Sequence, residues 1–298
     1  MRPSIIEAVT ISDAWYQAIY NLIKGDRDKY PRAVYKISKG SYVGQKRLEF
    51  EFFFCTIKHP LAEPMLPEFP EALKIPVPVD EGMDYIASYF AKYLMGTVLE
   101  DKETYIYGTW LAPGIERVID QLKGSPGNNQ ATISLGGWAP TGKIYYGPKD
   151  YTKLPTEQRD HLDEGGELIS RQSFDTEMVS IPLFQDTDNF FDPGTGQRDP
   201  ACLRQVDFRY TEDGKLHMFV YFRSWDLWGG FPANLAGLAL VQRHVASQIG
   251  AEVGMLTAAS KGLHLYDHCI DVACQRLGDD HSSMDDFLEF AKKRIDNE

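Results

Sequence analysis

The residues whose types could do chemistry are concentrated between positions 199 and 266. Cys202 ends the segment Asp199-Pro200-Ala201-Cys202, and Arg223-Ser224 follows further along the chain. A thiol that lies beside a fixed cation is readily converted to the nucleophilic thiolate. The planar fork of an arginine and a neighbouring serine hydroxyl also form a suitable set of phosphate ligands. The pattern therefore predicts a sulfur nucleophile next to an anion-binding site.

A predicted β-hairpin would bring these groups together. Residues 206–210 and 217–223 have the composition of two strands, and the pair Asp213-Gly214 between them is typical of a hairpin turn. In an antiparallel pair, the start of the first strand and the end of the second lie at the same end. We therefore expect Cys202 and Arg223-Ser224 at the same end of the two strands, with the thiol close to the cation.

Further polar residues follow the hairpin in the chain. Asn234 is near the start of a predicted helix, where its amide could either cap the helix or read the polar edge of a ring. His264 and Tyr266 could be ligands, or they could be a core histidine and a half-buried aromatic residue. Packing and surface ion pairing are likewise the commoner roles of a single cysteine or arginine. Considered one at a time, these residues do not define a function.

The rest of the chain predicts helices and strands without strict alternation, which favours an α+β fold with a mixed sheet. The first helix is expected to be capped by Ser12-Asp13. Apolar residues recur at helical spacing at residues 14–24, 83–95, 114–123, 233–249 and 284–295. Further strands are expected at residues 47–57, 131–135, 178–184 and 251–259. The proline-rich residues 60–78 are expected to form a connecting loop.

Residues 136–198 differ from the rest in composition. Gly, Pro, Asp and Tyr interrupt them repeatedly, and their apolar content is too low to build a separate core. We therefore expect a single domain over residues 1–298 that contains a long insertion at 136–198.

Charge and cysteine content exclude several classes of function. The 298 residues include 43 acidic and 31 basic residues, a net charge of −12, so a sequence-independent grip on nucleic acid is not expected. No apolar run approaches the ~18 residues of a membrane span, and the N-terminus lacks a signal peptide's apolar stretch. The four cysteines form no Cys-x-x-Cys pair, so neither a disulfide scaffold nor a metal site is expected. These features predict a soluble, cytoplasmic protein.

Taken together and in this order, the motifs resemble the C-terminal half of the thymidylate synthases, folate-dependent enzymes that methylate C5 of deoxyuridylate. The matching segments are Pro200-Ala201-Cys202, Arg223-Ser224-Trp225-Asp226, Gly230-Phe231-Pro232-Ala233-Asn234 and His264-Leu265-Tyr266. Upstream, Tyr105-Ile106-Tyr107-Gly108 is similar to a Tyr-Gly segment of the family, and residues 60–64 are similar to a segment of its archaeal-type branch. The resemblance implies a three-layer single domain with a large mixed sheet, the thymidylate synthase-like fold, which packs as a homodimer.

The resemblance also implies a role for each matched residue in making thymidylate from deoxyuridylate (dUMP) and 5,10-methylenetetrahydrofolate. The thiolate of Cys202 would add to C6 of the pyrimidine, and Tyr107 would help to remove the C5 proton through ordered water. Asp226, as a catalytic and cofactor-binding residue, would contact the pterin ring of the folate. Arg223 and Ser224 would bind the 5′-phosphate of the nucleotide. Asn234 would bind the O4/N3 edge of uracil, and His264 and Tyr266 would bind the ribose.

Two departures from the family pattern change the expected site. Asn129-Gln130 stand where the family has two arginines that are donated to the phosphate across a dimer interface, so another cation is needed. Arg47 is the preferred candidate, ahead of Lys46 and Lys39. The glutamate that organises proton transfer in the family has no clear match. Glu63 is a candidate for that role, with a solvated loop carboxylate as the alternative.

Two other functions stay open. A pyrimidine nucleotide hydroxymethylase would use the same folate, but water would replace hydride in quenching the exocyclic methylene intermediate. A catalytically silent relative would bind nucleotide or RNA, which the loss of the arginine pair at Asn129-Gln130 permits. Retention of Cys202, Asp226 and Asn234 favours an enzyme, because binding alone would not require them.

Overall fold

The computed structural model describes residues 2–38, 42–68, 82–98, 105–135 and 201–278, together with residues 285 and 289. By its internal contacts the chain divides into two units, residues 1–136 with 188–298, and residues 137–187. All described residues belong to the first unit. The predicted strand at 178–184 and insertion at 136–198 lie outside the described residues, as does the predicted helix at 284–295 apart from residues 285 and 289.

The first unit has the predicted α+β fold, with two mixed sheets. The larger sheet has the strand order β1 (Ser4–Ala8), β4 (Phe53–Ile57), β9 (Glu252–Ser260), β7 (Lys215–Phe222), β6 (Leu203–Tyr210) and β5 (Thr132–Ser134). The smaller sheet has the order β2 (Arg32–Lys36), β3 (Lys46–Phe50), β10 (Leu263–Tyr266) and β8 (Trp225–Asp226). The pairs β1–β4, β7–β9 and β8–β10 are parallel and the others are antiparallel, which makes both sheets mixed.

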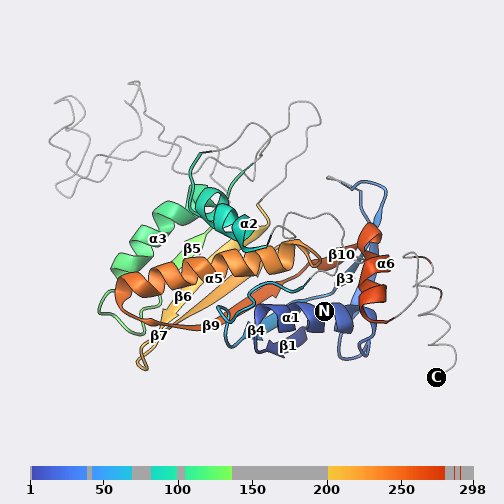
Figure 1. The fold of residues 1–298 in the computed structure, drawn as a ribbon, viewed down its shortest axis with the longest axis horizontal. Coiled ribbons are helices and arrows are strands. Elements are labelled where there is room, and N and C mark those ends of the chain that lie inside the picture. Colours follow the sequence, from blue (N-terminus) through green and yellow to red (C-terminus); the bar gives the residue numbers. More distant parts are fainter. Residues whose placement is uncertain are drawn as a thin grey trace, which may run out of the picture. The chain divides into compact units, whose positions relative to one another are not determined.

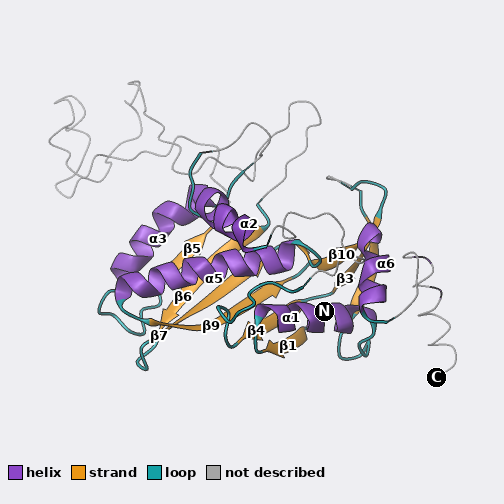
Figure 2. Cartoon of the chain, in the orientation of Figure 1, coloured by secondary structure: helices purple, strands orange, loops and turns teal. Residues whose placement is uncertain are grey.

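Helices pack on the larger sheet across its width (Figures 1 and 2). The long helix α5 (Gly230–Ile249) contacts the central strands β7 and β9, whereas α1 (Ile11–Ile23) and α3 (Gly108–Leu122) contact the edge strands β1 and β5. The short helix α2 (Met83–Ser88) continues into a π-helix, η3 (Tyr89–Leu94), and both pack on α5. Helix α6 (Asp267–Arg276) follows β10 and contacts the smaller sheet.

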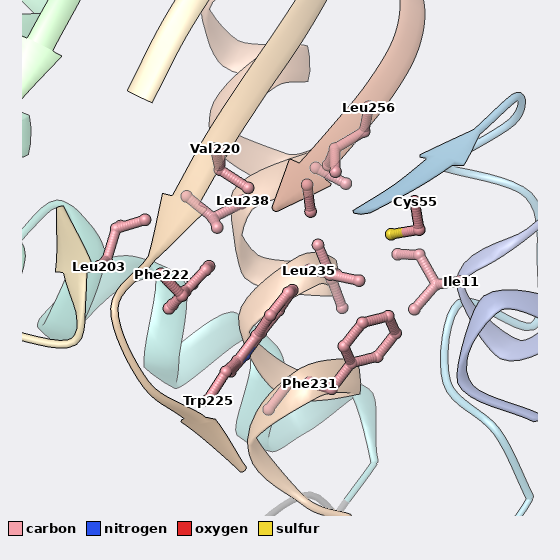
Figure 3. Packing of buried hydrophobic residues seen from close by; sticks show 14 of the residues in the cluster. Ile11, Cys55, Leu203, Val220, Phe222, Trp225, Phe231, Leu235, Leu238 and Leu256 are labelled. Carbon is pink, nitrogen blue, oxygen red and sulfur yellow. The ribbon is translucent and has the colours of Figure 1, made fainter. Parts of the chain in front are cut away.

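Alternation of side chains along the strands produces the core between α5 and the larger sheet. In β7, residues 216, 218, 220 and 222 are buried and the residues between them are half-buried, as period-two patterning requires. Leu235 and Leu238 of α5 pack into the same cluster, where the Trp225 indole stacks on Phe222 with ring centroids 4.1 Å apart (Figure 3). This core fixes the ends of β7 and α5 relative to each other.

The chain passes from one sheet to the other at three adjacent points, which we call the sheet crossing. Residues 51–52, 223–224 and 261–262 connect β3 to β4, β7 to β8 and β9 to β10. The three connections are neighbours because Phe53 and Phe222 both pair with Ser260, and the Trp225 N–H donates to the Gly262 carbonyl (2.9 Å). The sheet crossing therefore positions Arg223-Ser224.

Several predicted boundaries were wrong. The single strand expected at 47–57 is two strands in different sheets, because the chain turns at residues 51–52. Helix α1 begins earlier than expected and is capped by Thr10, whose Oγ1 accepts from the Asp13 N–H (3.1 Å). Helix α3 begins at Gly108 and accommodates Pro113, the residue before the predicted start. Helix α5 begins at Gly230, so Asn234 lies within it and does not cap it. In the described part of the chain, no helix is both long and apolar enough to cross a membrane.

Candidate active site

The β6–β7 pair places Cys202 beside Arg223, as the predicted hairpin requires. Leu203 pairs with Phe222 at the end of the ladder, and the Arg223 main-chain N–H donates to the Cys202 carbonyl (2.9 Å). The Arg223 Nε–H donates to the carbonyl of Ala201 (3.2 Å). The main chain and the guanidinium of Arg223 thus both bind the segment that contains Cys202.

Cys202 differs from the other three cysteines in its exposure. It is half-buried, whereas Cys55, Cys269 and Cys274 are buried. Burial raises the pKa of Cys55 to about 12 and also raises the pKa of Cys269. A thiol in such surroundings stays protonated at neutral pH and is a poor nucleophile. Cys202 is therefore the cysteine best placed to react with a ligand.

Two tyrosines contact the Cys202 segment, the buried Tyr107 and the half-buried Tyr105. The Cys202 N–H donates to the Tyr105 hydroxyl (3.2 Å), and the Leu203 N–H donates to the Tyr107 hydroxyl (3.3 Å). Burial, and then the neighbouring ionisable groups including Cys202, raise the pKa of both phenols. Each phenol therefore keeps its proton at neutral pH and can donate it to an acceptor beside the sulfur.

A row of tyrosines runs from α2 through η3 to this point, and we call it the tyrosine row. Tyr85, Tyr89 and Tyr93 stack with successive centroid separations of 6.0 and 5.3 Å. Tyr93 then meets the edge of Tyr107 at 5.2 Å, and Tyr107 lies 5.6 Å from Tyr105. We did not predict this row. Its signal in the sequence is the four-residue spacing of three tyrosines within a predicted helix.

Asn234 is held at both polar atoms of its amide. The Trp225 Nε1–H donates to Asn234 Oδ1 (2.9 Å), and Asn234 Nδ2 donates to the hydroxyl of Tyr89 (2.8 Å). Burial is the largest influence that raises the pKa of Tyr89. The side chain of Asn234 therefore has a defined orientation before any ligand binds.

The carboxylate of Asp226 binds the start of helix α5. It accepts hydrogen bonds from the main-chain N–H groups of Trp228 (3.1 Å), Gly229 (3.0 Å) and Gly230 (2.8 Å). Free N–H groups at a helix start favour a carboxylate there. Asp226 therefore links the sheet crossing to the helix that carries Asn234.

Strand register aligns the remaining residues on one face of the smaller sheet. His264 is directly opposite Glu49 of β3 and beside Asp226 of β8. Tyr266, two residues further along β10, is opposite Arg47. Directly opposed residues, and residues two apart in a strand, share a face. The smaller sheet thus presents these five side chains together.

His264 is neutral in the folded protein. Its side chain is buried, and its Nδ1 lies 2.8 Å from the Gly262 carbonyl, which can only accept, so Nδ1 carries the hydrogen. Burial is the largest influence and lowers the pKa of His264 to about 4. The ring of His264 meets the edge of the Tyr266 ring with centroids 4.5 Å apart. Tyr266 is half-buried, and burial raises its pKa.

Arg47 and Glu49 form an ion pair within this face. The Arg47 Nε is 2.8 Å from the Glu49 Oε2, which is itself 3.9 Å from Nδ1 of His264. Burial raises the pKa of Glu49 although Arg47 acts in the opposite direction. We did not single out Glu49, whose signal in the sequence is an acidic residue two positions after Arg47 in a strand of alternating charged and apolar residues.

Several predicted residues are not brought to this cluster by any contact among the described residues. Glu63 is exposed, and its Oε2 accepts from the N–H of Met65 in its own loop (3.3 Å). Lys46 pairs with Asp285, and Lys39 lies outside the described residues. Asn129 accepts a hydrogen bond from Arg209, whose Nη1 also donates to the carbonyl of Gly127 (3.0 Å). Ser224 is half-buried at the sheet crossing, next to Arg223.

The buried, neutral state of His264 predicts a pH dependence of stability. Its folded pKa of about 4 lies below the ordinary value of 6.5, so between these values the unfolded chain binds a proton that the folded chain does not. Stability from this group is complete above pH ~6.5 and is lost as pH falls. We expect its share of the unfolding free energy to drop by about 2 kcal/mol from pH 7 to pH 5. Urea unfolding of the parent and of His264→Gln at both pH values measures this share, and an equal loss in both proteins contradicts it.

Comparison with known proteins finds relatives of similar sequence. A family model described as thymidylate synthase matches residues 193–295. A protein of Methanosarcina acetivorans named "Putative thymidylate synthase" is 27% identical over 274 residues, which cover 90% of this chain and 92% of that protein. Its namesake from Methanosarcina mazei is 26% identical over the same shares. The thymidylate synthase of Zymomonas mobilis is 35% identical over 78 residues, 26% of each chain.

Proposed function

We propose that this chain, which belongs to the thymidylate synthase family, reductively methylates C5 of dUMP with 5,10-methylenetetrahydrofolate to give thymidylate and dihydrofolate. The observation that carries the proposal is the placement of Cys202. Cys202 is half-buried, and its segment is held by Arg223 and by the phenols of Tyr105 and Tyr107. A thiol in a segment held beside a cation supports a role in addition to an unsaturated carbon.

In the proposed reaction, Cys202 forms a bond from its sulfur to C6 of the pyrimidine, and the electron pair of the C5–C6 double bond moves onto C5 and the C4 carbonyl. C5 then attacks the methylene carbon of the folate, which breaks the bond between that carbon and one folate nitrogen. Loss of the C5 proton breaks the remaining methylene–nitrogen bond and leaves an exocyclic methylene on the pyrimidine. A hydride from the folate adds to this methylene, and the sulfur leaves C6 as the C5–C6 double bond re-forms. Tyr107 would hold the water that takes the C5 proton, a role that its contact with the Leu203 N–H and the raised pKa of its phenol support.

The other residues of the cluster are assigned to the nucleotide and the folate. Arg223 and Ser224, at the sheet crossing, would bind the 5′-phosphate, and Arg47 would add a second cation. His264 and Tyr266 would contact the ribose hydroxyl, and Asp226 the pterin ring. Asn234 would bind the O4/N3 edge of uracil with the hydrogen-bonding capacity that Trp225 and Tyr89 leave free. Glu63 receives no role, because its contacts with the described residues are confined to its own loop.

The proposal includes a homodimer that packs through the larger sheet. On the face of this sheet that is turned away from the core, strand pairing aligns Ile5, Phe54, Ala259 and Tyr221. Ile5 is 54% exposed, Phe54 and Tyr221 are half-buried, and Ala259 is buried. An apolar row across a sheet face supports a surface that a second copy covers. Because a nucleophilic thiol must stay reduced, the proposal also places the enzyme in the cytoplasm.

The assay that tests the proposed reaction separates it from hydroxymethylation. Purified protein is incubated with dUMP and 5,10-methylenetetrahydrofolate, and both the nucleotide and the folate products are identified by mass spectrometry. We expect thymidylate and dihydrofolate in equal amounts. A 5-hydroxymethyl nucleotide with tetrahydrofolate would contradict the proposal in favour of a hydroxymethylase, and absence of any product with retained dUMP binding would favour a silent nucleotide-binding protein. Sedimentation of the same preparation at twice 33.8 kDa is expected for the dimer.

A further inference from the structure

We infer that Trp225 determines the base specificity of this site by fixing the orientation of the Asn234 amide. The inference rests on the proposed function, because it assumes that Asn234 faces the pyrimidine. Which pyrimidines the site accepts would then depend on a residue that does not itself touch the base. Trp225 is therefore a positioning residue.

The indole of Trp225 has little freedom to move. Its side chain is 2% exposed and stacks on Phe222 with centroids 4.1 Å apart and an angle of 7° between the ring planes. Phe231, with a centroid separation of 4.6 Å, packs on the same indole (Figure 3). The indole nitrogen, 2.9 Å from Oδ1 of Asn234, is consequently a fixed point in the site.

A fixed indole nitrogen permits only one orientation of the amide. An indole N–H donates and cannot accept, so it can bind only the oxygen of Asn234. Rotating the amide by 180° would bring its NH₂ group against the indole N–H and leave two donors in contact. The hydroxyl of Tyr89, 2.8 Å from Nδ2, can either donate or accept and would tolerate both orientations. The choice between them therefore comes from Trp225.

This orientation selects between pyrimidines that differ at C4. Once Trp225 and Tyr89 are bound, Asn234 has one further lone pair on Oδ1 and one further hydrogen on Nδ2. A 4-oxo pyrimidine offers a donor at N3 and an acceptor at O4, which complement these two groups. A 4-amino pyrimidine offers the reverse, so both contacts would become repulsive. A freely rotating amide would adapt to either base, whereas a fixed one accepts only the 4-oxo base.

The test is equilibrium binding of dUMP and dCMP to the full-length protein by titration calorimetry, which needs no turnover. For the parent we expect dUMP to bind at least ~100-fold more tightly than dCMP, because two polar contacts that are favourable with dUMP become repulsive with dCMP. Trp225→Phe retains the aromatic stacking but removes the N–H donor, and we expect this ratio to fall by ~10-fold or more. Trp225→Met, which also lacks a donor, is the second variant if the first does not fold.

Tyr89→Phe is the matched comparison, because it removes the other hydrogen-bond partner of the same amide. It should weaken binding of dUMP yet keep the dUMP/dCMP ratio within about threefold of the parent. If these aromatic residues had only a structural role, the dUMP/dCMP ratio would change to the same extent in both variants. An unchanged ratio in Trp225→Phe overturns the inference alone, whereas failure of the parent to bind either nucleotide overturns the proposed function together with it.

Discussion

Replacement of Cys202 by alanine should abolish turnover while leaving the fold intact. The sulfur is the atom proposed to add to C6 of the pyrimidine, and none of the other three cysteines can substitute for it, because they are buried. We expect kcat to fall by at least ~10⁴-fold, the scale on which loss of a covalent nucleophile acts. Binding of dUMP should persist, since the proposed phosphate and base ligands are other residues. Steady-state kinetics and calorimetry on the same preparation measure the two effects separately.

The matched control is Cys274→Ala, which removes a buried thiol from helix α6. It should keep parental kcat and reduce only stability, because a small buried side chain is lost. Turnover by Cys202→Ala within about tenfold of the parent would exclude covalent addition through this sulfur. Loss of dUMP binding in a folded Cys202→Ala protein would argue instead that the segment is needed only for binding.

Replacement of Arg223 by alanine is expected to lower kcat/KM by on the order of 10³-fold. The variant loses the charge proposed to bind the phosphate and the Nε–H donor to Ala201 that holds the Cys202 segment. Each charge-assisted hydrogen bond contributes roughly 1.5–3 kcal/mol, so the two losses together account for a change of this size. Steady-state kinetics with dUMP as the varied substrate measures it.

Arg223→Lys separates the two roles of this side chain. Lysine retains the positive charge but has no Nε–H placed at the carbonyl of Ala201, so KM should recover more than kcat does. Arg243→Ala, which removes an exposed arginine from α5, controls for loss of charge and should leave both constants unchanged. Equal recovery of KM and kcat in Arg223→Lys would contradict the role of Arg223 in holding the segment.

The sequence predicted the placement of Cys202 beside Arg223 because that placement depends on local signals. Alternating apolar residues and an Asp-Gly turn define the β6–β7 hairpin, and a hairpin determines which residues lie together at its open end. The long helix α5 and strand β9 were likewise evident from periodicity alone. The placement of Cys202 beside Arg223 is therefore determined by residues that are close together in the sequence and regularly patterned.

The remaining geometry depends on contacts between distant segments, which patterning does not contain. The segment at 47–57 looks like one strand because charged and apolar residues alternate and then give way to an apolar run, but hydrogen bonding to β10 and β9 divides it between two sheets. That division places Glu49 opposite His264 and leaves both side chains buried. In the same way, the partners of Asn234 come from η3 and from β8, so neither could be inferred from the residues adjacent to it. Helix η3 is also a π-helix, for which the sequence carried no signal that we used.

Covalent addition through Cys202 is the central claim, and a mechanism-based analogue tests it most directly. Protein mixed with 5-fluorodeoxyuridylate and 5,10-methylenetetrahydrofolate should form a complex that stops once carbon–carbon bond formation is complete, because the fluorine at C5 cannot leave as a proton does. Denaturing mass spectrometry should then show the chain heavier by one nucleotide and one folate, with the added mass on the peptide that contains Cys202. An unmodified chain, or the added mass on a peptide without Cys202, would contradict the account.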